Sequence, residues 1–419
     1  MKILISTGEV SGDIVGGLLT REIRAQCADA VVFGIGGACM ANAGAIVRFN
    51  SSHLGTVGVS EAFHTLPDFV RAAATLRRIV RDDRPDVAVL IGNDVFHVLL
   101  GRWLRSCGVP TIAYFPPQTW IWRSLARWIA GSFDVVFASF PDEQVVYRRA
   151  SPATEVIFVG HYLSDALRRR TSGSIRAARE RLGIPDDARV VGVLPGSRGH
   201  ELRKLLSTLI DTTRLLADGD PTLQFLVPVA HDRYRLDIAR EVVRVGLAER
   251  VTILSGPSHD AMVAADLLIL ASGTASLEAT LLGVPMIIVY KVSLLTYGIV
   301  RLCIRLGLID SDIVGLPNLI LGRRAVPELI QQHATAPAIA AMAADVLSSP
   351  GRQQEILAAL AEAARHVSGG DTLARAVRDL LDRAAPRAAE TPARPPVVDA
   401  VDGVMAGAST LDAPVPESK

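Results

Sequence analysis

A glycine-rich turn between a predicted strand and a predicted helix is the part of this sequence best suited to hold a phosphate. Residues 193–201 read VLPGSRGHE, and an apolar strand at 190–194 leads into Gly196, Ser197 and Arg198. Glycine lets the backbone approach a ligand, free N–H groups at a helix start attract an anion, and arginine can bind phosphate oxygens with paired donors. The same pattern also suits an ordinary strand-to-helix turn with an exposed arginine, so both interpretations stay open for this turn alone.

A second turn of the same kind lies further along the chain. Residues 271–278 read ASGTASLE, again a strand end that passes into a helix. Ser272, Gly273 and Thr274 can offer two hydroxyls and backbone N–H groups to a diphosphate. Glu278 lies about one helical turn further on the same face, where its carboxylate can accept hydrogen bonds from a ribose diol. We favour this role for Glu278 over that of a solvated helix residue.

The first half of the chain also carries polar residues where predicted strands end. They lie at 8–13, at 92–94, at 116–123 and at His161. Ligands of open parallel sheets bind at the carboxyl ends of the strands, so these three turns and the two turns described above, five in all, should meet around two ligands. Asp13 can be a catalytic group or the N-cap of the first helix, and His161 can bond a ligand or the backbone. The residues themselves do not decide between these roles.

Composition excludes several other functions. The chain has 419 residues, 49% of them hydrophobic and 21% charged, which indicates a globular protein of two domains. Its net charge of +1 does not indicate the excess of basic residues that is typical of nucleic-acid-binding proteins. The four cysteines are scattered, so we expect no metal site. No turn carries a complete glycine motif for NAD binding or ATP hydrolysis.

Short apolar strands alternate with helical stretches, which predicts an α/β fold with parallel sheets. The strands are expected at 2–6, 31–35, 86–91, 111–114, 135–139, 156–159, 190–194, 224–229, 251–254, 267–271 and 286–289. A polar, arginine-rich linker at 163–187 separates two series. We expect two Rossmann-like domains facing each other across a cleft, over 1–170 and 188–383, the second with a wholly helical end at 336–384. A disordered tail, rich in proline and alanine, is expected over 384–419.

In their order, the motifs resemble those of the lipid A disaccharide synthase family of inverting glycosyltransferases, which have two Rossmann-like domains (a GT-B type fold). The motifs are GEVSGD at 8–13, WIWR at 120–123, GH at 160–161, LPGSRG at 194–199, ASGTA at 271–275 with Glu278, and LPNL at 316–319. The resemblance implies transfer of 2,3-diacylglucosamine from its UDP derivative to 2,3-diacylglucosamine 1-phosphate. UDP would be released, in lipid A biosynthesis, with no metal and no other cofactor.

The resemblance also distributes residues between the two substrates. The UDP-sugar side would comprise Gly196, Ser197, Arg198, Ser272, Gly273, Thr274, Glu278 and Asn318. The acceptor side would comprise Glu9, Ser11, Trp120, Trp122, Arg123 and His161. Many family members act at the inner membrane surface and can form homodimers. We therefore expect a cytoplasmic protein that is peripheral on the inner membrane.

One position departs from the family pattern at the expected catalytic base. Directly after the strand at 86–91 the family usually has an aspartate that is thought to be the base, and this sequence has Gly92. Asp94 is near enough to replace it if the loop shifts by one or two residues. Asp13 is a second candidate for the base, and His97 is a weaker one.

A second departure also lies on the acceptor side. The serine-proline-serine that precedes the tryptophans in the family is PPQ at 116–118 here, whereas the nucleotide-side motifs are intact. The pattern suits a divergent synthase. It leaves two alternatives: a related UDP-sugar transferase or UDP-GlcNAc 2-epimerase with another acceptor, and a non-catalytic homologue that binds UDP-sugars.

One apolar stretch bears on membrane contact. Residues 293–308 read SLLTYGIVRLCIRLGL and combine leucines and isoleucines with Arg301 and Arg305. A buried helix is the default interpretation, but the same pattern suits a helix that lies on a membrane surface. No run of about 18 uncharged apolar residues occurs, so no membrane span is predicted.

Overall fold

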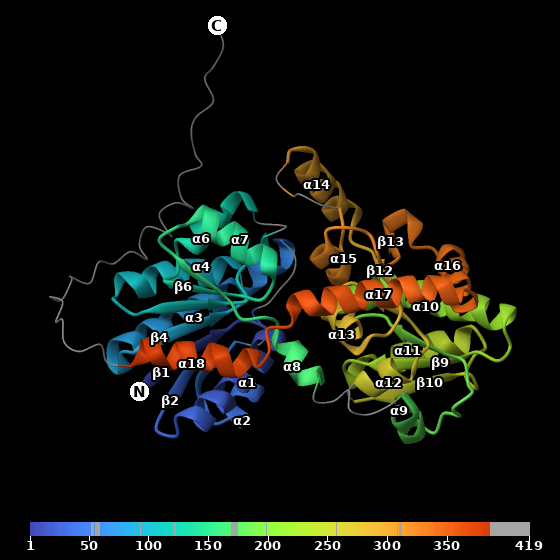
Figure 1. The fold of residues 1–419 in the computed structure, drawn as a ribbon, viewed down its shortest axis with the longest axis horizontal. Helices are drawn as coiled ribbons and strands as arrows, with labels where there is room; N and C mark the ends of the chain where they lie inside the picture. The colour runs from blue at the N-terminus through green and yellow to red at the C-terminus, as the bar shows by residue number, and fades with distance from the viewer. Residues whose placement is uncertain are drawn as a thin grey trace, which may run out of the picture.

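The computed structural model contains two parallel β-sheets, each packed against helices, which form two lobes side by side (Figure 1). It describes residues 1–51, 54, 59–92, 94–119, 123–168, 175–197, 199–256, 258–307, 309 and 312–385. The expected α/β class with two Rossmann-like units is confirmed by this architecture. The expected tail at 384–419 lies outside the described residues from 386 onward.

The first sheet has the strand order β3-β2-β1-β4-β5-β6-β7. The strands are β1 Lys2–Thr7, β2 Val31–Gly36, β3 Ile46–Asn50, β4 Val87–Ile91, β5 Thr111–Tyr114, β6 Val135–Ala138 and β7 Glu155–Phe158. The helices between them are α1 Val10–Gln26, α2 Ala38–Asn42, α3 Val59–Asp83, α4 Asp94–Ser106, α6 Ala126–Ala130 and α7 Pro141–Ala150. The order reverses between β1 and β4, which pair directly with Thr7 opposite Ile91.

The second sheet has the order β10-β9-β8-β11-β12-β13 and reverses between β8 and β11. Its strands are β8 Val190–Leu194, β9 Gln224–Val229, β10 Val251–Ser255, β11 Leu267–Ala271, β12 Met286–Tyr290 and β13 Glu328–Ile330. Its helices are α9 Ile175–Leu182, α10 Gly199–Gly219, α11 Arg235–Arg244, α12 His259–Ala264, α13 Thr274–Leu282, α14 Leu294–Arg305, α15 Leu316–Leu321, α16 Ala336–Ser348 and α17 Pro350–Val367. The residues of β8 and β11 are all buried, as expected for strands covered on both faces.

Two strands were not expected from the sequence, and both are outermost in their sheets. In β3 the side chains alternate between exposed and half-buried, and β13 has three half-buried residues. Neither strand therefore has the continuous apolar run that identifies a central parallel strand. The helical end expected at 336–384 is present, but it is divided into α16, α17 and α18 (Thr372–Ala384).

The last helix returns to the first lobe. Figure 1 shows α18, in red, beside the blue N-terminal helices, and α18 packs against α1 and α8 (Tyr162–Arg168). Its residues Val377 and Leu380 belong to the same buried cluster as Ile3 and Val89 of the first sheet. The boundary expected at residue 383 was drawn from chain order alone and stays a prediction. The packing assigns α18 to the first lobe.

The chain segments that join the two lobes touch each other. An added Cβ on Gly369 would lie 1.9 Å from the Val159 carbonyl oxygen, and one on Gly160 would lie 2.5 Å from the Gly369 nitrogen. The His161 N–H donates to the Val367 carbonyl at 2.9 Å. Only glycine fits at such a close crossing of two backbones. The outgoing and returning connections are therefore held together at one point.

Candidate functional site

The candidate residues of each lobe gather where the strand order of its sheet reverses. In the first sheet β1 and β4 end side by side, so Glu9 and Gly92 are neighbours. In the second sheet β8 and β11 are the corresponding pair, so the turn at 195–199 adjoins the turn at 272–274. This edge of an open α/β sheet is where ligands bind. Both lobes thus present their candidate residues at the position that the fold favours.

Glu9 and Gly92 approach each other across the first of these edges. Gly92 has a φ of +62°, a left-handed conformation that favours glycine, and an added Cβ would lie 3.3 Å from Glu9 Oε1. Glu9 is half-buried at the start of α1, and its side chain does not cap the helix. Among the described residues, no hydrogen bond or ion pair engages its carboxylate. Ser11, also half-buried, follows in the first turn of α1.

Asp13 has a different role from either that was expected. The helix α1 begins at Val10, so Asp13 lies inside it, 4% exposed. Its carboxylate accepts the backbone N–H groups of Gly37 at 2.7 Å, Cys39 at 2.8 Å and Met40 at 3.2 Å. These N–H groups belong to the start of α2, so Asp13 caps α2 rather than α1. Because both carboxylate oxygens are engaged, we do not retain Asp13 as a catalytic base.

His97 supports the Gly92 turn from within the protein. Its Nδ1 donates to the Gly92 carbonyl at 2.5 Å, and its Nε2 accepts from the Ser6 hydroxyl at 2.8 Å. Burial lowers the pKa of His97 to about 4, so the ring is neutral at physiological pH. Both ring nitrogens are therefore used within the fold, and His97 positions Gly92 rather than accepting a proton from a substrate.

Several expected site residues cannot be placed. Asp94 begins α4, but its side chain lies outside what the structure describes, and so do Trp120, Trp122 and Arg198. Their expected roles stay predictions.

An aromatic cluster connects the two lobes next to Glu9. Phe115, Phe140 and Tyr162 surround His161, with ring centroids 4.9, 5.7 and 4.9 Å from the imidazole, respectively. Leu277 of α13 is fully buried in the same core cluster, and α13 packs against α8. Burial lowers the pKa of His161 to about 3. His161 is thus a neutral residue of the packing between the lobes, bonded to the backbone at the crossing of the two connections.

Tyr162 brings the two halves of the candidate site together. Burial raises the pKa of its phenol, and the charges of Glu278 and then Glu9 raise it further. Glu9 belongs to the edge of the first sheet, whereas Glu278 belongs to α13 of the second lobe. The charge of one carboxylate from each lobe therefore acts on this buried phenol. Since α8 also packs against α13, Glu9 and Glu278 belong to one candidate site around Tyr162.

The start of α13 is open. Gly273 has a φ of +154°, and nothing lies within 4 Å of the position that its Cβ would occupy. Thr274 is exposed, and the first N–H groups of a helix have no acceptor within the helix. The Ser272 hydroxyl, by contrast, donates to the Val314 carbonyl at 2.7 Å, so it holds the turn in place. An anion would meet backbone N–H groups and Thr274 here.

Asn318 and the turn at 195–199 are engaged within the protein. Asn318 is fully buried; its amide nitrogen donates to Val326 and Glu328, and its amide oxygen accepts the N–H groups of Ala325 and Val326, all at 2.8 Å. Asn318 therefore holds the segment 325–328 in place, and its amide has no free group for a ligand. In the other turn, Glu201 accepts the Ser197 N–H at 3.0 Å beside Gly196. A phosphate bound there would compete with this carboxylate.

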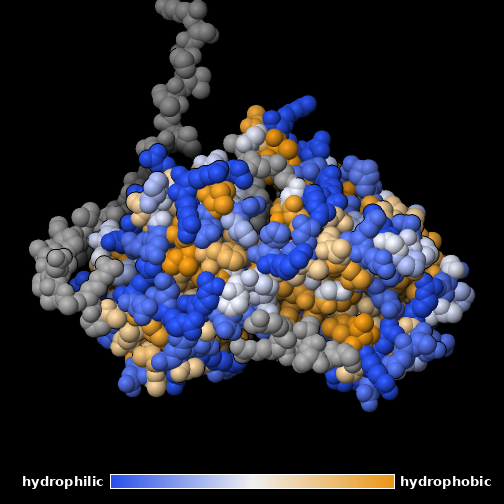
Figure 2. Space-filling view, in the orientation of Figure 1, coloured by the Kyte–Doolittle hydropathy of each residue, from blue (hydrophilic) through white to orange (hydrophobic). Residues whose placement is uncertain are grey.

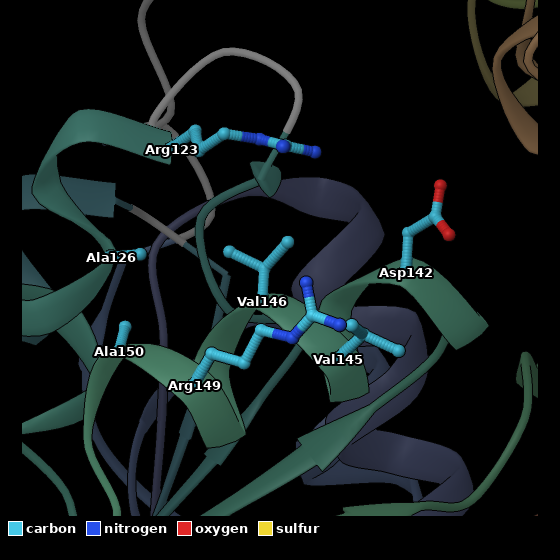
Figure 3. Close-up of a pocket in the computed structure, with 7 residues that line it drawn as sticks. All are labelled: Arg123, Ala126, Asp142, Val145, Val146, Arg149 and Ala150. Atoms are coloured by element: carbon cyan, nitrogen blue, oxygen red, sulfur yellow. The ribbon is translucent and has the colours of Figure 1, made fainter.

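Arg123, expected on the acceptor side, lines a separate cavity of about 380 Å³ on the first lobe. Figure 3 shows Arg123 and Arg149 on either side of Val146, with Val145 beside them and the Asp142 carboxylate directed away. The cavity thus combines cationic walls with an apolar floor.

Three residues of interest escaped the sequence analysis. His259 follows β10, and its Nε2 lies 3.3 Å from Glu278 Oε2. Lys291 follows β12, donates to the Thr208 hydroxyl at 3.0 Å, and has a pKa lowered by burial. Tyr162 directly follows the GH motif. His259 and Lys291 stand after strand ends, so the positional rule that identified the other residues was the signal available for them.

We expect the stability of the protein to fall in mild acid because of His97. Its pKa is about 4 in the folded protein and 6.5 ordinarily, so between these values only the unfolded chain binds the proton. The free energy of unfolding is therefore complete above pH 6.5 and decreases as the pH falls towards 4, by about 2 kcal/mol at pH 5 for one such histidine. His161 acts in the same direction.

Chemical unfolding at pH 7 and pH 5 measures this loss. In His97→Gln the difference between the two pH values should shrink by about 2 kcal/mol. The exposed His366→Gln should keep the wild-type difference. An unchanged difference in His97→Gln would show that His97 is charged in the folded protein.

Comparison with known proteins identifies the family to which this chain is similar. A family model described as lipid-A-disaccharide synthetase matches residues 3–368. A lipid-A-disaccharide synthase from Pseudomonas aeruginosa is 35% identical over 384 residues, which is 91% of this chain and 99% of the relative.

Solved structures support the fold. The UDP-GlcNAc 2-epimerase of Neisseria meningitidis, bound to UDP-GlcNAc, is similar with a TM-score of 0.64 at 14% identity, over 91% of this chain and 100% of that one. A glycosyltransferase from Rickettsia africae has a TM-score of 0.55 at 10% identity, over 92% of this chain and 99% of that one. The family match over nearly the whole described chain decides between these activities: the chain belongs to the lipid-A-disaccharide synthetase family.

Proposed function

We propose that the protein is a lipid-A-disaccharide synthase that transfers 2,3-diacylglucosamine from its UDP derivative to 2,3-diacylglucosamine 1-phosphate and releases UDP. The observation that carries this proposal is the family match over residues 3–368. The single site around Tyr162, with a carboxylate from each lobe, supports it. A transferase needs its donor and its acceptor side by side, and this arrangement provides for both.

The donor would bind at the edge of the second sheet. The open start of α13 offers backbone N–H groups and Thr274 to the diphosphate, whose negative charge grows as the sugar leaves. Glu278, further along α13, would accept hydrogen bonds from the ribose diol. Gly196 and Ser197 adjoin this position on the neighbouring turn, and Arg198 follows them in the sequence.

The two alternatives from the sequence differ from the synthase in their products. An epimerase would return an altered UDP-sugar without using an acylated acceptor. A binding protein would hold the UDP-sugar unchanged. The acceptor, the membrane surface and the homodimer that the resemblance implies are parts of the proposal. Gly92 stands where the family has its expected catalytic base, so the acceptor is the part that the next experiment tests first.

The function is tested by incubating the purified protein with both acylated substrates in detergent micelles and following products by mass spectrometry. We expect UDP and an acylated disaccharide 1-phosphate in equal amounts, and no disaccharide when the acceptor is omitted. An epimerised nucleotide sugar, or donor binding with no product on this acceptor, would reject the synthase assignment.

We predict that Glu278→Ala weakens UDP binding about 10- to 100-fold, since a hydrogen bond to a charged group is worth about 1.5–3 kcal/mol. Isothermal titration calorimetry with UDP measures this directly. The matched control is Glu249→Ala, an exposed glutamate of the same lobe, which should bind UDP as the wild type does. Equal affinity in the two variants would remove Glu278 from the donor site.

We also propose that α14 is the part of the protein that contacts the membrane. Among the described helices none is long and apolar enough to cross a bilayer. Four apolar side chains on or beside α14 are strongly exposed: Leu294 (86%), Ile299 (52%), Leu302 (55%) and Leu306 (64%). Arg301 and Arg305 accompany them. Figure 1 shows α14 projecting from the second lobe, and Figure 2 shows hydrophobic surface beside hydrophilic surface at that tip.

Leu302→Asp should lower binding to vesicles that contain anionic phospholipid about tenfold or more, because it removes an exposed leucine that would insert into the bilayer and adds a negative charge. Vesicle sedimentation measures the bound fraction. Leu236→Asp on α11, where the leucine is 69% exposed, is the control and should bind as the wild type does. Equal sedimentation of both variants would show that α14 does not make the contact.

A further inference from the structure

An inverting transfer of the proposed kind needs a base at the acceptor hydroxyl. The oxygen of that hydroxyl attacks the anomeric carbon, the bond from this carbon to the diphosphate breaks, and the bonding electrons leave with UDP. The hydroxyl proton must pass to a group of the protein within hydrogen-bond reach. The identity of this base rests on the proposed function, and the first-sheet edge is where the base must lie, because the donor occupies the second.

The carboxylates and imidazoles of the first lobe near this edge differ in what they already bind. Asp13 is engaged by three backbone N–H groups. His97 is 2% exposed, and both of its ring nitrogens are bonded. His161 is buried among aromatic rings between the lobes. Each of these groups would have to give up a contact that the fold depends on before it could accept a proton.

Glu9 has the opposite properties. It is half-buried at the edge itself, and among the described residues its carboxylate has no hydrogen bond or ion pair. Its Oε1 lies 3.3 Å from where a Cβ of residue 92 would stand. Since residue 92 is glycine, the space beside Oε1 is not filled by a side chain from that position. A hydroxyl group of the acceptor can enter there.

Glu9 also lies on the side of the first lobe that faces the donor position. Its charge and that of Glu278 act on the same phenol of Tyr162, so Glu9 lies on the side of the first lobe that meets α13. The Gly92 carbonyl is held by His97 at 2.5 Å, which fixes the turn that faces Glu9. The Glu9 carboxylate therefore faces a residue whose carbonyl is held in place by a buried histidine.

We infer that Glu9 is the catalytic base of this protein, and that Gly92 provides the space in which the acceptor hydroxyl meets Glu9 Oε1. Glu9 accepts the hydroxyl proton as the new bond to the anomeric carbon forms, and the protonated carboxyl returns this proton to water after the products leave. Glu9 thus takes the role that the sequence suggested for Asp94.

The test compares Glu9→Gln with Glu22→Gln, a conservative change on the same helix, α1. Glu9→Gln should lower the rate of disaccharide formation about 100-fold or more, as loss of a general base does, while UDP affinity stays within about twofold of the wild type. Glu22→Gln should leave both unchanged. Adding Gly92→Asp to Glu9→Gln should restore part of the rate, since aspartate tolerates the left-handed conformation and directs a new carboxylate into the same space.

The outcomes separate this inference from the function on which it rests. A wild-type protein without transfer activity rejects the proposed function, and the base with it. An active wild type with an undiminished Glu9→Gln rejects Glu9 alone, as does a loss of rate in Asp94→Asn that Glu9→Gln does not share. A double variant no faster than Glu9→Gln contradicts the claim that residue 92 and Glu9 reach the same hydroxyl.

Discussion

The packing of α13 against the aromatic cluster of the first lobe is the contact on which the composite site depends. Leu277 is fully buried among residues of the first lobe, and it lies one position before Glu278. The same helix presents its open start to the donor position. Leu281, Leu282, Leu316 and Ile320 pack against the same cluster, so apolar packing between the lobes sets how far the donor-side groups stand from Glu9 and Tyr162. Burial of a leucine side chain contributes about 1.5–3 kcal/mol, which stabilises the packing of α13 against the first lobe.

Polar groups that are already satisfied have a structural role, whatever their type suggests. Asp13, His97 and Asn318 are residue types that often work in active sites, yet each is buried with its hydrogen-bonding capacity used inside the fold. Removing such a partner leaves buried donors or acceptors unpaired, which is costly. Glu9 and the start of α13 are not bound in this way. Unused hydrogen-bonding capacity at the strand ends distinguishes the groups available to substrates from those that build the site.

Much of the fold followed from the sequence, because central parallel strands are apolar throughout and end in glycine turns. Strands such as 111–114 and 190–194 were placed at their observed limits. The outer strands β3 and β13 were missed because half-exposed residues do not give that signal. The turns of the site were located correctly as strand ends, whereas the internal partners of Asp13, Ser272 and Asn318 were not foreseen, and the roles of the other side chains stay predictions. Asp13 contacts residues far along the chain, and no local pattern reveals such partners.

The crossing of the two connections at Gly160 and Gly369 has a mechanical consequence. Because the two connections contact each other there, this crossing is the natural pivot for a rotation of one lobe relative to the other. Positions near a pivot are displaced little, and Tyr162 follows Gly160 by two residues. Structures distant from the crossing are displaced more by such a rotation, and α14 projects from the second lobe away from that point (Figure 1). A rotation about this crossing would thus displace α14 more than the residues around Tyr162.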